Sequence, residues 1–193
     1  VAPSPAGTDG AMALYFEQQL EPMNLNDFSG GKPVGVDVAG KLVPAVLKVG
    51  ALVNRGLSAS SHYKAIFSWL QVLLGFSCTF ILVFDGRGRY APKAARAHKE
   101  RAADEARDRD KATRHDAAGE TNAADKLWER IVHRPTLHDL VSFTQQVCSK
   151  LGVAWCVAPY EADHQLALMA GRGELAAVVP PHNDSDLPVY GIP

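Results

Sequence analysis

The chain has 193 residues, a formal net charge of -1 and a hydrophobic fraction of 47%, as expected for a globular protein with one substantial core. A near-neutral charge excludes a strongly basic nucleic-acid binder on average, although it leaves room for a local basic patch. The three cysteines, Cys78, Cys148 and Cys156, lack the spacing of a metal site. They are expected to be reduced thiols.

The first half of the chain begins with residues 1–10, a Pro, Gly and Ser-rich segment that is predicted to be disordered. Hydrophobic patterning then predicts a helix over 11–22, a buried strand over 33–37, helices over 43–53 and 61–74, and a strand over 79–84. The apolar run 66–84 is nearly long enough to span a membrane. Polar residues interrupt it and its second half is rich in strand formers, so a helix followed by a buried strand is predicted instead. No cleavable signal and no membrane association are expected.

Residues 93–122 are a dense mixture of Ala with both charges, and they contain almost no large apolar side chain. This composition favours a helix without a buried face. One interpretation is a solvated helix, supported by pairs four residues apart such as Glu105 with Arg109 and Asp110 with Arg114. The alternative is a basic arm over a substrate channel.

The second half of the chain predicts helices over 126–132 and 136–151, with Gly152 as a stop signal. A strand over 153–157, a helix over 162–170 and a strand over 176–179 follow. Strands that alternate with helices predict a parallel α/β sheet. No internal repeat is visible.

Each predicted strand leads into one or two carboxylates, and open parallel sheets bind ligands at the carboxyl ends of their strands. Acids gathered in a cleft would repel one another unless divalent cations neutralised them, and carboxylate oxygens suit Mg²⁺ or Mn²⁺. Two such ions would suit phosphodiester hydrolysis. Taken singly, each acid has an ordinary alternative as a turn former or helix cap. The predicted catalytic and metal-binding residues are Asp37, Asp85, Glu161, Asp163, Asp184 and Asp186.

Four motifs carry a family resemblance: GVDVAG, ILVFDG, LGVAWCVAPYEADHQLA and NDSDLPVYG, which contain these six acids in order. The chain resembles the XPG-type 5′ nucleases, and APYEAD is more similar to the exonuclease-one branch than to the flap endonucleases. The resemblance implies a PIN-like, three-layer α/β fold with a mainly parallel sheet, and it makes the acids ligands of two Mg²⁺ ions, which Mn²⁺ can replace. It implies one nuclease domain over 11–193, with a helical arch at about 93–122 and with the family's C-terminal helix-two-turn-helix part absent.

The resemblance also implies what the chain acts on. The expected function is magnesium-dependent, structure-specific 5′ cleavage of branched or 5′-ended DNA, with RNA left open. The expected location is nuclear, with an organelle as the alternative. Val43 replaces an aromatic or His side chain that stacks on a base in the family, and the N-terminus departs from the family start. These departures leave a second hypothesis, a nuclease-derived structural subunit of a larger assembly. The residues expected to contact substrate phosphates are Lys93, Arg96, Lys99 and Arg101.

Overall fold

The computed structural model describes residues 30–86 and 91–179, and for residues 91–98 it describes the backbone alone. The predicted disordered segment 1–10, the predicted helix over 11–22 and the two acids Asp184 and Asp186 lie outside the described residues.

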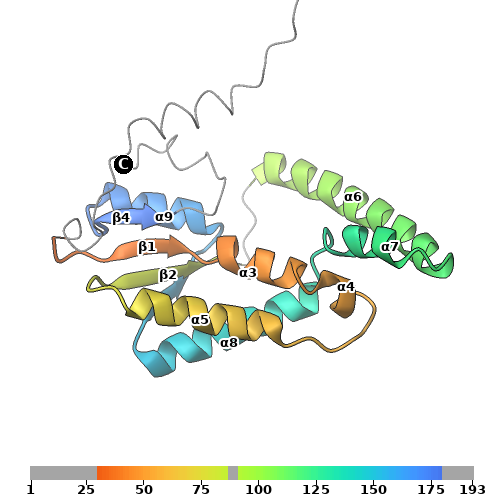
Figure 1. The fold of residues 1–193 in the computed structure, drawn as a ribbon. Helices are drawn as coiled ribbons and strands as arrows, with labels where there is room; N and C mark the ends of the chain where they lie inside the picture. The colour runs from red at the N-terminus through yellow and green to blue at the C-terminus, as the bar shows by residue number, and fades with distance from the viewer. Residues whose placement is uncertain (1–29, 87–90, 180–193) are drawn as a thin grey trace, which may run out of the picture.

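Within the described residues, the centre of the fold is a sheet of four parallel strands, in the order β3-β2-β1-β4 (Figure 1). Its members are β1 (Val34–Asp37), β2 (Phe80–Phe84), β3 (Ala154–Val157) and β4 (Ala177–Val179). The described strands lie within one residue of the predicted ones, which confirms the parallel α/β prediction. Because all four run in the same direction, their carboxyl ends share one edge of the sheet.

Helices cover both faces of this sheet and make three layers (Figure 1). Helices α3 (Ala39–Leu47), α5 (Ser61–Leu74) and α8 (Arg134–Leu151) pack on one face, where Leu42, Leu70, Leu82 and Leu140 are fully or almost fully buried. Helix α9 (Ala162–Gly171) covers the other face through Leu166, which packs in one cluster with residues of β2. Alternate residues of β1 and β2 therefore face different layers, as expected for a strand buried on both sides.

The helix predicted over 43–53 is wrong in its bounds, because it is two helices, α3 and α4 (Gly50–Val53), and it begins earlier. The Ala39 N–H donates to Asp37 Oδ1 at 2.7 Å, which holds the chain in a turn directly after β1. The break allows a close approach between helices: a Cβ on Gly50 would lie 2.5 Å from the carbonyl oxygen of Trp128. The local hydrophobic pattern of residues 43–53 carries no sign of this contact.

The charged segment forms one long helix, α6 (Ala91–Ala117), followed by α7 (Thr121–Trp128), which corrects the helix predicted over 126–132. Together α6 and α7 make a hairpin beside the sheet, here called the arch hairpin (Figure 1). Arg114 pairs with Asp110 as predicted, whereas Glu105 contacts Arg134 rather than Arg109. Arg109 instead lies over the Trp128 ring, 5.8 Å from its centroid. The hairpin has a small core of its own, formed by Ala112, Ala124, Trp128 and Ile131.

Two further predictions concern the apolar run and the thiols. Residues 66–84 form the end of α5, a turn and β2, and among the described helices none combines the length and the hydropathy of a membrane span. Cys78 and Cys148 are buried free thiols, and Cys156 is a partly buried one. Helix α8 ends at Gly152, whose φ of 71° is the left-handed conformation predicted for a glycine stop.

Candidate active site

Asp37 is the last residue of β1 and is almost completely buried, with 4% of its surface exposed. Burial raises the pKa of its carboxyl group to about 7, and the Ala39 N–H bond opposes that rise. The negative charges of Asp85 and Asp163, together with a hydrogen bond to Asp163, raise the pKa further. A buried acid with two acidic neighbours needs either a proton or a cation to be stable.

Asp85 follows β2 and retains an exposed surface at the same edge of the sheet. Its Oδ1 accepts a hydrogen bond of 2.9 Å from the N–H of Ala162, the first residue of α9. Asp85 therefore satisfies one of the free amides at a helix N-terminus, where negative charge is favoured. Partial removal from water nevertheless raises the pKa of its carboxyl group, and the charge of Asp163 adds to that rise.

Gly86 explains why Asp85 can lie beside the start of α9. A Cβ on Gly86 would lie only 1.9 Å from the carbonyl oxygen of Ala158, so a larger residue would push the two segments apart. The Gly86 N–H also donates to the Tyr160 carbonyl at 2.6 Å, and the Ala158 N–H donates to Phe84 at 2.8 Å. The Asp-Gly sequence thus joins the end of β2 to the loop that follows β3.

The loop after β3 leads into α9, and the two remaining described acids, Glu161 and Asp163, lie at the start of this helix. Asp163 lies in the first turn of α9, half-buried, where it interacts with both Asp37 and Asp85. Glu161 is the N-cap residue of the helix, and its carboxylate lies 3.8 Å from His164 Nδ1. The fold therefore brings Asp37, Asp85 and Asp163 together, whereas Glu161 interacts with His164 beside them.

These three carboxylates have the chemistry of a site for a hard divalent cation. Asp37 and Asp85 each use one oxygen on a backbone N–H, which fixes the orientation of the carboxyl group. Within the described residues, however, no group of three or more His, Cys, Asp or Glu side chains has the arrangement to hold a metal ion. Asp184 and Asp186, which the sequence assigns to the same site, follow β4 outside that part of the chain.

The predicted phosphate contacts lie on the arch hairpin. Lys99 and Arg101 are exposed on α6, so they are accessible to a polyanion. Lys93 and Arg96 belong to the first turns of the same helix, where the structure describes the backbone only. Val43 lies partly exposed on α3, in the second turn of that helix. The absence of base stacking at this position stays a prediction.

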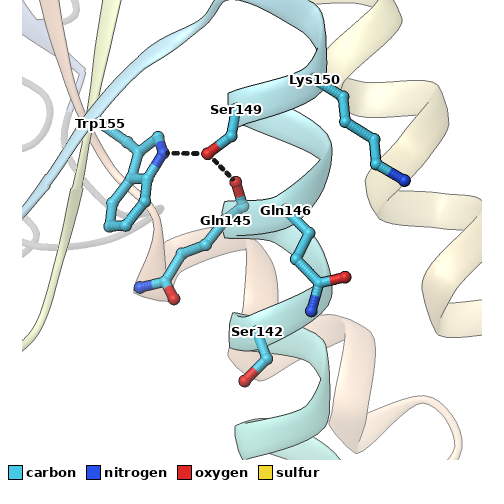
Figure 2. A pocket seen from close by; sticks show the side chains of 6 residues that line it. All are labelled: Ser142, Gln145, Gln146, Ser149, Lys150 and Trp155. Carbon is cyan, nitrogen blue, oxygen red and sulfur yellow. Dashed lines mark hydrogen bonds between the residues drawn. The ribbon is translucent and has the colours of Figure 1, made fainter.

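A hollow of about 490 Å³ lies away from these acids, between α8 and β3 (Figure 2). Its lining includes Lys150 but none of the predicted acids. Trp155 Nε1 donates to Ser149 Oγ at 3.0 Å, and Ser149 in turn donates to the carbonyl oxygen of Gln145 at 2.9 Å (Figure 2). Because its lining contains no carboxylate and no acid–base pair, we place the candidate active site at the carboxylate edge.

Comparison with known proteins identifies sequence relatives and solved structures that this chain resembles. No family model matches the chain. The chain is 28% identical to exonuclease 1 of Arabidopsis thaliana over 192 residues, which is 96% of this chain. It is 29% identical to exonuclease 1 of Oryza sativa subsp. japonica and 27% identical to that of Danio rerio, over 83% and 92% of this chain.

Solved structures show the same fold. The catalytic core of Rad2, in complex with DNA substrate, matches 94% of this chain with a TM-score of 0.57 and 18% sequence identity. A second Rad2 complex matches with a TM-score of 0.56 and 20% identity. The α/β architecture described above is therefore that of the Rad2 nuclease core. The resemblance to XPG-type 5′ nucleases, predicted from four motifs, is confirmed, and the relatives that match carry the name exonuclease 1. The chain spans between 18% and 24% of the length of these curated relatives.

Proposed function

We propose that this chain is the catalytic part of a magnesium-dependent, structure-specific 5′ nuclease that hydrolyses phosphodiester bonds in DNA. The observation that carries the proposal is the meeting of Asp37, Asp85 and Asp163 at the carboxyl edge of the sheet, with the first two pKa values raised. Exonuclease 1 relatives that align over nearly the whole chain support the same reaction class. We assign residues 11–193 to one nuclease domain, with the arch hairpin as its insertion.

The proposed cofactor is a pair of Mg²⁺ ions, which Mn²⁺ can replace, held by the three clustered acids with Glu161, Asp184 and Asp186. When bound, the ions supply Lewis acidity toward the attacking water and the leaving oxygen. Asp37 must lose its proton to serve as a ligand, so cation affinity should rise as the pH increases through about 7. Asp85, fixed by the Ala162 N–H, presents its other oxygen in a constant orientation.

Substrate contacts are assigned to the arch hairpin. Lys93, Arg96, Lys99 and Arg101 would bind phosphates of a 5′ strand and offset charge that develops at the scissile phosphate. This predicts cleavage that weakens steeply as salt is raised, because phosphate binding releases counterions. DNA is proposed over RNA because the Rad2 structures hold a DNA substrate. We also propose a nuclear location and, as a hypothesis, a role within a larger assembly.

The test is a cleavage assay on a 5′-labelled flap, a recessed-end duplex and an RNA of matching structure, with Mg²⁺ or with EDTA. We expect Mg²⁺-dependent cleavage of one DNA substrate, with 5′-phosphate ends, and no cleavage by Asp163→Ala or Asp186→Ala. Asp139→Ala, which replaces an exposed acid of α8, is the matched control. If RNA is cleaved faster than either DNA, RNA and not DNA is the substrate. If a folded chain cleaves none of the substrates, the structural-subunit hypothesis is favoured.

A further inference from the structure

Arg55 joins three helices at the base of the arch hairpin. It follows α4, and its Nε and Nη2 donate to the two oxygens of Asp116, at 3.1 and 2.7 Å, near the end of α6. Its Nη1 lies 2.6 Å from Asp125 of α7 and donates to the Ala51 carbonyl at 2.9 Å. One guanidinium therefore contacts a carboxylate on each arm of the hairpin, here called the Arg55 bridge (Arg55, Asp116 and Asp125).

Neighbouring groups hold the Arg55 bridge in place. Trp128 Nε1 donates to the same Asp116 carboxylate at 2.8 Å. The hydrogen bonds from Arg55, together with the one from Trp128, hold the pKa of Asp116 below its usual range. Asn54 donates from Nδ2 to the Ile131 carbonyl at 3.0 Å, just past the end of α7. The bridge is also less exposed than an ordinary surface pair: Arg55 and Asp116 are 23% and 31% exposed, against 72% and 62% for Arg107 and Asp104. A bidentate pair withdrawn from water fixes geometry better than an exposed one.

The position of the Arg55 bridge matters because α6 is long and straight (Figure 1). A small rotation about the end of α6 that the bridge holds would therefore move the other end by several ångströms. Arg101 lies fifteen residues before Asp116 on the helix, a distance of about 22 Å at 1.5 Å per residue. A rotation of roughly 10° about the anchored end would then displace the region of Arg101 by about 4 Å. Displacements of about 1 Å at a reacting centre already cost catalysis heavily, so the anchor would control how α6 meets a substrate.

We propose that Arg55 is a positioning residue, which holds α6 at one angle to the sheet through Asp116 and Asp125 so that the cations of α6 face the carboxylate edge. This inference rests on the proposed function, because it concerns how the substrate phosphate is placed. Arg55 itself touches neither the acids nor the proposed phosphate-binding residues among its described contacts.

The test compares Arg55→Gln with Arg107→Gln, which removes an exposed arginine from α6 itself. Hydrogen exchange of the backbone amides is measured by mass spectrometry, and the cleavage rate is measured with saturating and with limiting DNA. We expect Arg55→Gln to speed exchange in residues 99–117 at least tenfold, to leave exchange in β1 and β2 unchanged, and to lower kcat at least tenfold with less than a threefold change in KM. Arg107→Gln should change none of these.

A second pair of variants guards against a folding defect. Asp125→Asn removes one charge from the Arg55 bridge and should give a smaller change of the same kind, while Arg55→Lys, which retains one ionic contact, should recover part of kcat. Unchanged hydrogen exchange in Arg55→Gln would contradict the claim that the Arg55 bridge holds α6 in place. Faster exchange with a normal kcat would contradict the positioning role of Arg55. If the unaltered chain cleaves no substrate, the proposed function fails separately, and the exchange data alone then decide whether the anchor exists.

Discussion

Asp37 combines a buried carboxyl group with two acidic neighbours, an arrangement that weakens the fold when no cation is bound. Its pKa is raised from 3.8 to about 7, so between these values the folded chain retains a proton that the unfolded chain releases. Raising the pH through this window therefore favours the unfolded chain, and the fold should be more stable at pH 5 than at pH 8.

The first prediction follows from this pKa. Asp37→Asn removes the charge and keeps an oxygen that can accept from Ala39, so it should raise the free energy of unfolding at pH 8 by about 1–3 kcal/mol. Urea unfolding in EDTA at pH 5 and pH 8 measures this, with Asp104→Asn, an exposed acid of α6, as control. A variant less stable than the unaltered chain at pH 8 would show that the Asp37 charge does not destabilise the fold.

The second prediction concerns Gly86, where a Cβ would overlap the Ala158 carbonyl oxygen. Gly86→Ala should lower the free energy of unfolding by about 1–3 kcal/mol, because backbone must move to admit the methyl group. It should also displace Asp85 and reduce cleavage. The control is Gly171→Ala at the end of α9, where nothing lies within 4 Å of the added Cβ. Equal unfolding free energies for the two variants would contradict the close contact.

At the scale of elements, the packing of β1 against α9 depends on Gly35. A Cβ there would lie 2.5 Å from Leu166 Cδ2 and 2.7 Å from Leu175 Cδ1. Gly35→Ala should cost about 1–3 kcal/mol, and Leu166→Ala alone about 2–5 kcal/mol. In the double variant the methyl group occupies space that Leu166 vacates. The loss of unfolding free energy in the double variant should therefore be smaller than the sum of the losses in the two single variants. Fully additive unfolding free energies would mean that the two side chains do not share this space.

The elements that the sequence predicts well are those whose signals are local. Alternating apolar residues and strand formers located the four strands that the structure describes, and the position of each acid after a strand predicted that Asp37 and Asp85 would share an edge. The break between α3 and α4 was missed because it depends on Gly50 meeting Trp128, which is distant in sequence. Arg55 was missed for the same reason, since nothing around it indicates that its partners are 61 and 70 residues away.

The site was predicted less completely than the fold. The order of the motifs predicted that all six acids share one edge of the sheet, and the structure brings Asp37, Asp85 and Asp163 together there. Motif order could not reveal that Glu161 is the N-cap residue of α9, with its carboxylate 3.8 Å from His164 Nδ1. Side-chain direction at a helix start depends on the local turn, which motif spacing does not specify. The catalytic and metal-binding roles of all six acids stay predictions, as do the phosphate contacts of Lys93, Arg96, Lys99 and Arg101, which the resemblance to a nuclease family supplied.

For the whole molecule, metal binding should appear as stabilisation. A ligand that binds only the folded chain raises the free energy of unfolding, by about 2.7 kcal/mol at one hundred times its dissociation constant. Mg²⁺ should therefore raise the melting temperature at pH 8, and EDTA should reverse the rise. Asp85→Asn should reduce the effect, whereas Asp104→Asn should retain it. A melting temperature independent of Mg²⁺ in the unaltered chain would contradict a metal site.

We propose above that the carboxylate edge performs phosphodiester hydrolysis. The most direct test of this proposal is the single-turnover rate of a 5′-labelled DNA, measured at saturating enzyme and 10-fold steps of Mg²⁺ concentration, for the unaltered chain and for Asp85→Asn. We expect a rate that rises with Mg²⁺ in the unaltered chain and is at least about a hundredfold lower in a folded Asp85→Asn protein. Equal rates for the two proteins would contradict it.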